Sequence, residues 1–323
     1  MIVFIGTRRQ THLLRTMRRD ARMPEWHCHT YQWLFRTRRL PAATYIFLGV
    51  DRLDHAERRL AGQYYRHING LGDGWRALND PAIAMGRYRL LRSLHTAGVN
   101  DFNAYLAAEG VTPARFPVFI RRNSSSTPPL TGLVTAPKEL QAEIDRLIAA
   151  GEPPEDLVII EYAGEPLRPG LFQKQSEYRI ADAYIPTPTI YAGDWVVKVS
   201  NTIPVPDNVA ERDVKVMENN PFAAVARTAF EIAGIEYGRA DIGIVGGRPQ
   251  IYEINFNPDV RTQREQPNAS PILARLWDQS DSLFFKALSE INSSARGTAP
   301  TLSNFDLTAF RLRFWRNYAP QRY

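Results

Sequence analysis

The chain has 323 residues, of which 44% are apolar and 23% charged, and its formal net charge is +6. This composition excludes wholesale disorder and a collagen-like repeat. It also excludes a bundle of membrane-spanning helices, since the longest apolar runs, such as residues 2–5, fall far short of the ~20 residues that a bilayer crossing needs. The single cysteine, Cys28, cannot form an internal disulfide. We therefore expect a reducing, cytoplasmic setting.

The first part of the chain alternates between predicted strands and helices. Residues 2–5 and 42–50 predict strands, a basic helix is expected as far as about Arg22, and a second helix begins near Asp54. This alternation predicts a small α/β unit over residues 1–78. Nine arginines fall within its first 39 residues. We interpret them as a solvated helix face, with an acidic partner or a nucleic acid as the less favoured alternatives.

Residues 79–160 predict an α+β subdomain. Asp80 followed by Pro81 is a typical helix start, because aspartate caps helix amides and proline fits the first turn. This helix is expected to end at Thr96. The other expected elements are a short helix at 101–109, a strand at 116–120, a helix at 138–150 and a strand at 157–162.

Residues 161–291 predict a second α+β subdomain, and residues 292–323 a linker and a tail. The expected elements are an antiparallel strand pair at 177–184 and 195–199, a helix at 221–233, strands at 238–245 and 250–256, and a helix at 280–291. The tail from Leu307 onward combines aromatic residues with arginines. We interpret it as a basic C-terminal helix docked on the protein, with an interfacial or partner-binding helix as the alternative.

A β-hairpin is predicted where two apolar strands flank Gly246 and Gly247. With a three-residue loop over 246–248, the pairing of the strands places Asp241 opposite Glu253. Side chains of the second strand alternate between two faces. One face carries Glu253, Asn255 and Asn257, and the other carries Tyr252, Ile254 and Phe256. One face is therefore expected to be core and the other a row of oxygen ligands.

Carboxylate and amide oxygens that converge from neighbouring strands are typical of a Mg²⁺ site, because this ion takes a few protein carboxylates together with phosphates and waters. The alternative is an exposed sheet face that carries two acids and an amide. The strongly apolar residues on either side of these acids argue against that alternative.

The hairpin, with Asp241 on one strand and Glu253-Ile254-Asn255 on the next, resembles the metal-binding signature of the ATP-grasp superfamily. Three upstream segments carry the same resemblance. Residues 79–98 look like the entry helix of that fold, 116–121 like the strand that ends in a phosphate-binding basic residue, and 158–163 like the hinge strand beside adenine. The resemblance implies an ATP-grasp fold, with a small N-terminal α/β unit, two α+β subdomains that clasp ATP and a basic C-terminal helix.

The resemblance also implies roles for individual residues. Asp241, Glu253 and Asn255 would hold Mg²⁺; Arg87, Arg121, Glu161, Tyr162, Ala163 and Lys174 would contact ATP; and Arg179, Lys198 and Arg261 would face the reacting groups. A surface charge is the alternative for each residue of the last group and for Lys174. Two features depart from the family pattern. Members usually carry lysine where Arg87 and Arg121 stand, and residues 123–132 offer Ser, Thr and Pro where a glycine-rich loop is usual.

An enzyme of this family activates a carboxylate with ATP as an acyl phosphate, which an amine or a thiol then attacks. The resemblance therefore implies an ATP- and Mg²⁺-dependent ligase, with Mn²⁺ as an alternative metal. Its substrates would be a small-molecule or peptide carboxylate and an amine or thiol acceptor. A kinase of the same fold and a weakly active nucleotide-binding regulatory or scaffold protein stay open as alternatives. Nucleic acid is not favoured as a partner, and a homodimer is expected on base rates alone.

Overall fold

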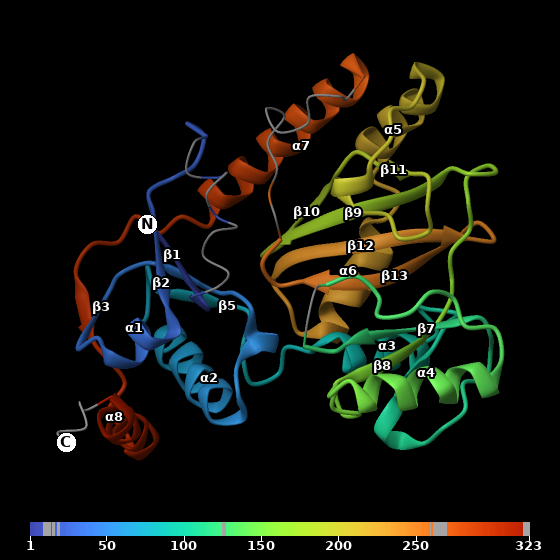
Figure 1. The fold of residues 1–323 in the computed structure, drawn as a ribbon. Helices are drawn as coiled ribbons and strands as arrows, with labels where there is room; N and C mark the ends of the chain where they lie inside the picture. The colour runs from blue at the N-terminus through green and yellow to red at the C-terminus, as the bar shows by residue number, and fades with distance from the viewer. Residues whose placement is uncertain are drawn as a thin grey trace.

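The computed structural model describes residues 1–8, 14, 17, 20–124, 127–258, 260 and 270–318, with the backbone alone at 199, 305 and 313–318. The described chain contains three sheets of three or more strands. Figure 1 shows the N-terminal sheet on one side of the molecule and the other two together on the opposite side. None of the helices in the described part of the chain has the length and apolar character needed to cross a bilayer.

The N-terminal sheet is parallel, with the strand order β2-β1-β4-β5. Its strands are β1 (Ile2–Gly6), β2 (Trp26–Thr30), β4 (Thr44–Phe47) and β5 (Arg76–Leu78), and its helices are α1 (Tyr31–Arg36) and α2 (His55–Asn69). β1 is buried throughout, with alternate side chains in two core clusters, as expected for a parallel strand covered on both faces. The predicted strands and the helix after Asp54 are confirmed. Most of the predicted basic helix falls on residues that the structure does not describe.

The C-terminal segment returns to this unit. β14 (Thr298–Pro300) pairs with β3 (Arg39–Pro41), and α8 (Phe305–Tyr318) lies beside α1, as Figure 1 shows. Leu307 is buried, Phe310 packs against Phe35, and Arg311 donates to the Phe35 carbonyl oxygen. The interpretation of the tail as a docked helix is therefore confirmed for its described residues.

The second sheet has the order β6-β8-β7. It contains β6 (Ala104–Leu106), β7 (Val118–Arg122) and β8 (Leu157–Glu161), and it is accompanied by α3 (Arg87–Thr96) and α4 (Pro137–Ala149). The expected helix at 101–109 is wrong, since its middle forms β6, which pairs with β8, and a 3₁₀ turn follows.

Helix α3 begins later than predicted, at Arg87 instead of near Asp80. The predicted cap at Asp80 forms only a local turn, in which its carboxylate accepts from the Ala82 amide. Arg58 donates to the carbonyl oxygens of Pro81 and Ala84, which a helix would have used itself. A side chain from α2 therefore takes the hydrogen bonds of the expected first turn.

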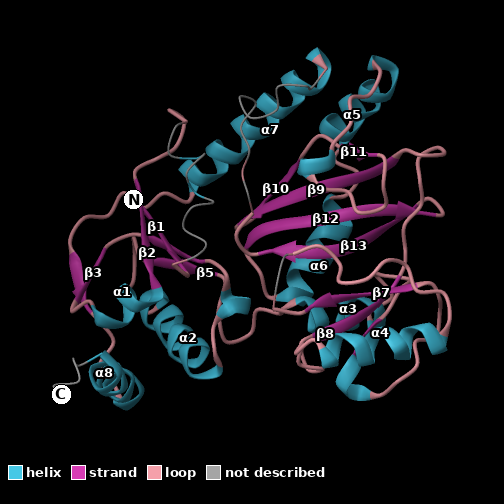
Figure 2. Ribbon diagram, in the orientation of Figure 1, coloured by secondary structure: helices cyan, strands magenta, loops and turns pink. Residues whose placement is uncertain are grey.

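The third sheet has the order β10-β9-β12-β13, and β11 also pairs with β9. Its strands are β9 (Phe172–Ile180), β10 (Ala183–Pro186), β11 (Ile190–Ala192), β12 (Tyr237–Val245) and β13 (Arg248–Asn255). Three helices belong to this part of the chain: α5 (Asp207–Asn219), α6 (Ala223–Ala233) and α7 (Pro271–Glu290). In Figure 2, α5 and α7 lie above the edge of the sheet that carries β10 and β11, and α6 lies behind the sheet. The predicted strand at 195–199 is wrong, since β10 and β11 pair with β9 in its place.

A buried asparagine joins the N-terminal unit to the third sheet. Asn79 is fully buried with φ of 66°. Its side-chain oxygen accepts from the amides of Glu236 and Tyr237, and its amide nitrogen donates to the carbonyl oxygens of Phe47 and Tyr237. All the hydrogen-bonding capacity of this amide is used, which fixes the end of β4 beside the start of β12.

Candidate active site

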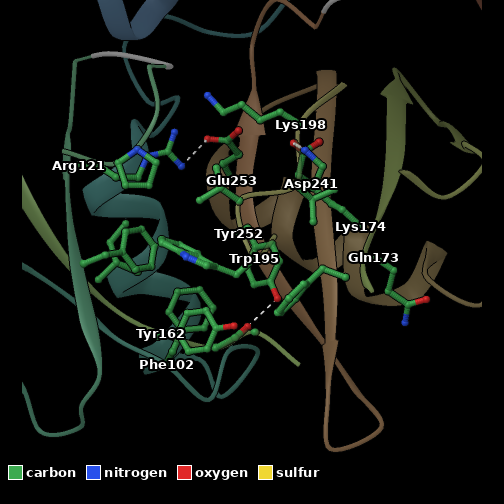
Figure 3. Close-up of a pocket in the computed structure, with 18 of the residues that line it drawn as sticks. Phe102, Arg121, Tyr162, Gln173, Lys174, Trp195, Lys198, Asp241, Tyr252 and Glu253 are labelled. Atoms are coloured by element: carbon green, nitrogen blue, oxygen red, sulfur yellow. Dashed lines mark hydrogen bonds and ion pairs between the residues drawn. The ribbon is translucent and has the colours of Figure 1, made fainter. Parts of the chain in front are cut away.

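A cavity of about 480 Å³ lies between the second and third sheets and takes in residues after β11. Figure 3 shows its two ends: charged side chains gather around Glu253 and Asp241, and aromatic side chains gather around Tyr162 and Tyr252. A volume of this size lies within the usual range for small-molecule sites.

The hairpin at the charged end has the predicted central pair but a different turn. Asp241 is paired with Glu253, as expected. The turn, however, contains only Gly246 and Gly247, both with positive φ, so the loop is one residue shorter than predicted. A β-bulge at Tyr252 restores the register, because it inserts one extra residue into β13 between the turn and Glu253.

Because of the bulge, Tyr252 lies on a different face of β13 from the one predicted. This residue was expected on the core face of β13, yet it lines the cavity together with Glu253. Its hydroxyl donates to the Ala163 carbonyl oxygen at 2.6 Å, across to the segment that follows β8. Gly243 makes room for the ring, since a Cβ there would come within 1.9 Å of the Tyr252 hydroxyl.

Asp241 is buried among three donors. Lys174 Nζ lies 2.8 Å from its carboxylate, Arg239 Nε lies 2.9 Å away, and the Ser176 hydroxyl donates at 3.1 Å. Burial alone would raise the pKa of Asp241, but Arg239 and Lys174 hold it below its usual value. The carboxylate is therefore ionised at neutral pH.

Two arginines hold Glu253, one from α3 and one from β7 of the second sheet. Arg87 lies 2.8 Å from its carboxylate and Arg121 lies 3.6 Å away. Burial opposes ionisation, yet these two guanidinium groups keep the pKa of Glu253 well below its usual range. Burial, together with the nearby Arg121, lowers the pKa of Lys198, which points towards Glu253 in Figure 3.

The charged end of the cavity has an excess of positive charge. Five cations, namely Arg87, Arg121, Lys174, Lys198 and Arg239, surround the two carboxylates. Five positive and two negative charges leave an excess of three. In a half-buried site such an excess favours a ligand with several negative charges, such as a polyphosphate.

Mg²⁺ fits the donor set at this end of the cavity. Asp241, Glu253 and Asn255 all line the cavity, and both acids are ionised. Among the described residues, no group of three or more His, Cys, Asp and Glu side chains is placed so that it could hold a metal ion by itself. Two carboxylates and an amide suit Mg²⁺, which takes a few protein oxygens together with phosphates and waters.

The other end of the cavity is aromatic. The Trp195 ring lies 5.0 Å from that of Phe119 and 5.6 Å from that of Tyr162, in tilted and edge-on arrangements. The rings of Phe102 and Tyr252, whose centroids lie 6.2 Å apart, also line the cavity. Flat apolar rings of this kind suit a planar base.

Comparison with known proteins identifies the fold. No family model and no curated protein matches the sequence. Among solved structures, D-alanine–D-alanine ligase from Bacillus anthracis matches with a TM-score of 0.50 and 14% identity, over 90% of this chain and 97% of that one. The chain has the ATP-grasp fold. The predicted α/β fold class is thereby confirmed.

Two further structures are similar to this chain. The Bacillus anthracis ligase complexed with ATP has a TM-score of 0.49 and 13% identity, over 90% of this chain and 96% of that one. A RimK domain protein ATP-grasp from Sphaerobacter thermophilus has a TM-score of 0.47 and 15% identity, over 89% of this chain and 98% of that one.

Most of the residues singled out in the sequence line this cavity. They are Arg121, Glu161, Tyr162, Ala163, Lys174, Lys198, Asp241, Glu253 and Asn255. Arg87 reaches the same centre through its ion pair with Glu253. The sequence predicts Lys198 on a strand, but it lies in the irregular segment after β11. Arg261 lies outside the described residues.

Glu161 differs from the expectation that its carboxylate faces the nucleotide. The side chain is 2% exposed and accepts hydrogen bonds from the Asn103 amide, the Tyr105 hydroxyl and both the amide and the guanidinium of Arg115. These donors occupy the carboxylate, so it supports the chain around β8. A ligand at this end of the cavity would therefore contact the backbone of residues 161–163 and not the Glu161 carboxylate.

Arg179 also differs from its expected position, since it is not among the cavity-lining residues described. Side chains of β9 alternate between its two faces, and Lys174 and Ser176 point to Asp241. Arg179 lies on the other face, where it donates to the carbonyl oxygens of Ala181 and Ile235 and packs over the Tyr184 ring.

The sequence reasoning missed Arg239 and Trp195. Arg239 could have been found, because it precedes Asp241 by two residues on β12 and so shares its face. Trp195 follows β11 in an irregular segment, and no periodic signal marks such a residue.

Proposed function

We propose that this protein is an ATP- and Mg²⁺-dependent ligase that activates a carboxylate as an acyl phosphate for attack by an amine or a thiol. The observation that carries the proposal is the excess of positive charge around Asp241 and Glu253 beside an aromatic recess. The two subdomains over residues 79–160 and 161–291 would clasp the nucleotide from opposite sides.

The aromatic end of the cavity would bind the adenine of ATP, and the charged end would bind its phosphates. Tyr162 and Trp195 would enclose adenine, and the backbone at Ala163 would read its edge. Arg121 and Arg87 would bind the phosphates bidentately, which lysines at these positions could not do. Each already pairs with Glu253, so binding phosphate exchanges one anionic partner for another.

Asp241, Glu253 and Asn255 would hold Mg²⁺, which, when bound, neutralises charge on the phosphates during transfer. Lys198 would contact the phosphoryl group in transit. Among the described residues it has no ion-pair partner within reach, in contrast to Lys174 and Arg239, which are paired with Asp241. Its free ammonium is therefore the cation most available to a new anion.

The reaction needs little covalent work from the protein. A substrate carboxylate oxygen forms a bond to the γ-phosphorus of ATP, and the bond from that phosphorus to the bridging oxygen breaks to release ADP. The amine then attacks the acyl carbon, phosphate leaves with the carboxylate oxygen, and the amine loses a proton. Cations at fixed positions, above all Lys198, would stabilise the negative charge that develops on oxygen.

The acid and the acceptor are proposed by class only. The similar structures include a D-alanine–D-alanine ligase and a D-Ala:D-Ser ligase, whose names identify amino acids as their substrates. For this chain we propose an amino acid or a peptide as the carboxylate, and an amine as the first acceptor class to test.

The test is release of ADP from ATP in pools of acids and amines, followed by mass spectrometry of the product. The proposal predicts that ADP release requires both an acid and an acceptor, and that ¹⁸O from a labelled carboxylate appears in phosphate. A stable phosphorylated product with no acceptor would show a kinase instead. The Lys198→Ala variant should lose turnover, whereas Glu165→Gln, at the exposed rim of the cavity, should retain it.

A further inference from the structure

Strand β9 has a second cavity on its opposite face. This cavity has a volume of about 430 Å³ and is lined by β9, the β11 region and α5. Gln173 lines both cavities. In Figure 3 its side chain points away from the other labelled residues, towards the opposite face of β9. The second cavity shares no charged side chain with the first.

The floor of this back cavity contains a buried acceptor that lacks a donor. Gln175 is 4% exposed, and its Oε1 atom has no hydrogen-bond partner among the described residues. Its Nε2 atom makes only a long contact of 3.4 Å to the Thr189 hydroxyl. A buried amide oxygen is stabilised when a donor reaches it, so the floor is suited to a ligand that brings an N–H group.

The neighbouring acid cannot fill this need. Asp213 is buried beside Gln175 in the lining, but its oxygens accept from the Thr189 amide and hydroxyl and from the Tyr191 hydroxyl. As an acceptor it reinforces the requirement for a donor. An ammonium group would satisfy the Gln175 oxygen and also lie in the negative field of Asp213.

The rim of the cavity carries positive charge, opposite to that of Asp213. Arg212 and Lys215 lie on exposed positions of α5, and neither forms an ion pair with a described residue. With Glu211 and Asp213, the lining has two positive and two negative charges. This balance suits a ligand with no net charge, in contrast to the excess of three positive charges in the nucleotide cavity.

Part of the lining is apolar. Val216, Phe222 and Ile244 form it, and Phe222 is buried. The cavity thus combines a buried acceptor, two exposed cations and apolar side chains in one lining. Few small molecules carry the three matching groups, and free amino acids with an apolar side chain are among them.

We propose that the back cavity binds a free amino acid with an apolar side chain. Its ammonium group donates to Gln175 Oε1, its carboxylate pairs with Arg212 and Lys215, and its side chain packs on Phe222 and Ile244. The site is separate from the proposed ATP site, so the inference does not depend on the ligase reading.

The first test uses three probes in calorimetric titrations of the full chain with saturating ADP present. L-Leucine carries all three groups, N-acetyl-L-leucine lacks the ammonium, and L-leucinamide lacks the carboxylate. We expect L-leucine to bind and each analogue to bind at least about tenfold more weakly, since each loses a charge-assisted contact. Equal binding of all three, or no binding of L-leucine, would overturn the proposal.

Two variants locate the bound leucine. Gln175→Leu removes the floor acceptor and leaves no new polar group unpaired, and Arg212→Ala removes a rim cation at an exposed position. Each should weaken leucine binding about tenfold, while Glu218→Ala, exposed on the same helix and outside the lining, should not change it. Unchanged binding in Arg212→Ala and Gln175→Leu would place leucine elsewhere. Competition with ADP in the wild type would also contradict the proposal, because it would place leucine in the nucleotide cavity.

Discussion

Changing Glu253 to glutamine should strengthen the binding of metal-free ADP and remove the gain in affinity that Mg²⁺ provides. In the free protein this carboxylate lies 2.8 Å from Arg87 and 3.6 Å from Arg121. Burial opposes its ionisation, but the two arginines hold its pKa well below the usual range, so it carries a full charge at neutral pH. The variant raises the excess of positive charge in the cavity from three to four.

The size of the effect follows from Coulomb's law. A charge about 6 Å from a phosphate contributes about 3 kcal/mol at an effective dielectric constant of about 20, and screening reduces this to about 1–3 kcal/mol. Metal-free ADP should therefore bind Glu253→Gln about 5–150-fold more tightly than the wild type. Mg²⁺ should no longer strengthen binding, because one of its two carboxylate ligands is lost.

The assay is calorimetric titration with ADP in the presence of a chelator and then of Mg²⁺. Glu165→Gln serves as the matched control, since this exposed carboxylate lies at the cavity rim and accepts from the Gly246 amide. Weaker binding of metal-free ADP to Glu253→Gln would refute the reasoning, as would an unchanged response to Mg²⁺. Either result would mean that Glu253 does not face the phosphates.

Three further predictions follow from single residues. Trp195→Ala should weaken ADP binding about 5–100-fold and leave inorganic triphosphate binding unchanged in competition titrations, because only the base contacts the rings. Burial raises the pKa of Glu177 to about 8 from an ordinary value of 4.5, so the folded state retains a proton that the unfolded chain releases between these values. The melting temperature should fall as pH rises through this window, and Glu177→Gln should remove that fall; parallel curves for the two proteins would contradict it. Leu307→Ala should lower the free energy of unfolding in urea by about 2–4 kcal/mol, whereas Leu312→Ala, 65% exposed on the same helix, should change it little; equal effects would mean that α8 is not docked.

The strongest sequence predictions concern segments with a clear apolar pattern and a clear end. The strand at residues 2–5 and the helix after Asp54 have both, and both are present. The pair of Asp241 with Glu253 is also present, but the turn is shorter than expected and the bulge at Tyr252 compensates. Turn length and bulges depend on packing against the rest of the sheet, which the local pattern does not contain.

Two of the wrong predictions share a physical cause, since contacts from distant residues override the local preference. Residues 101–109 have helical character, yet the chain there pairs with β8. The turn at Asp80 looks like a helix start, yet Arg58 from another helix binds its carbonyl oxygens. Arg179 was expected at the reaction centre, but the alternation along β9 had to be counted from Lys174 to exclude it.

The central claim is that the cavity between the second and third sheets binds ATP together with a divalent cation. Titration of the wild-type protein with ATP in a calorimeter, with Mg²⁺ and then with a chelator, tests it most directly. The account predicts binding of one ATP per chain that strengthens with Mg²⁺. A protein that unfolds cooperatively on heating, and is therefore folded, but takes up no ATP in either buffer would contradict it.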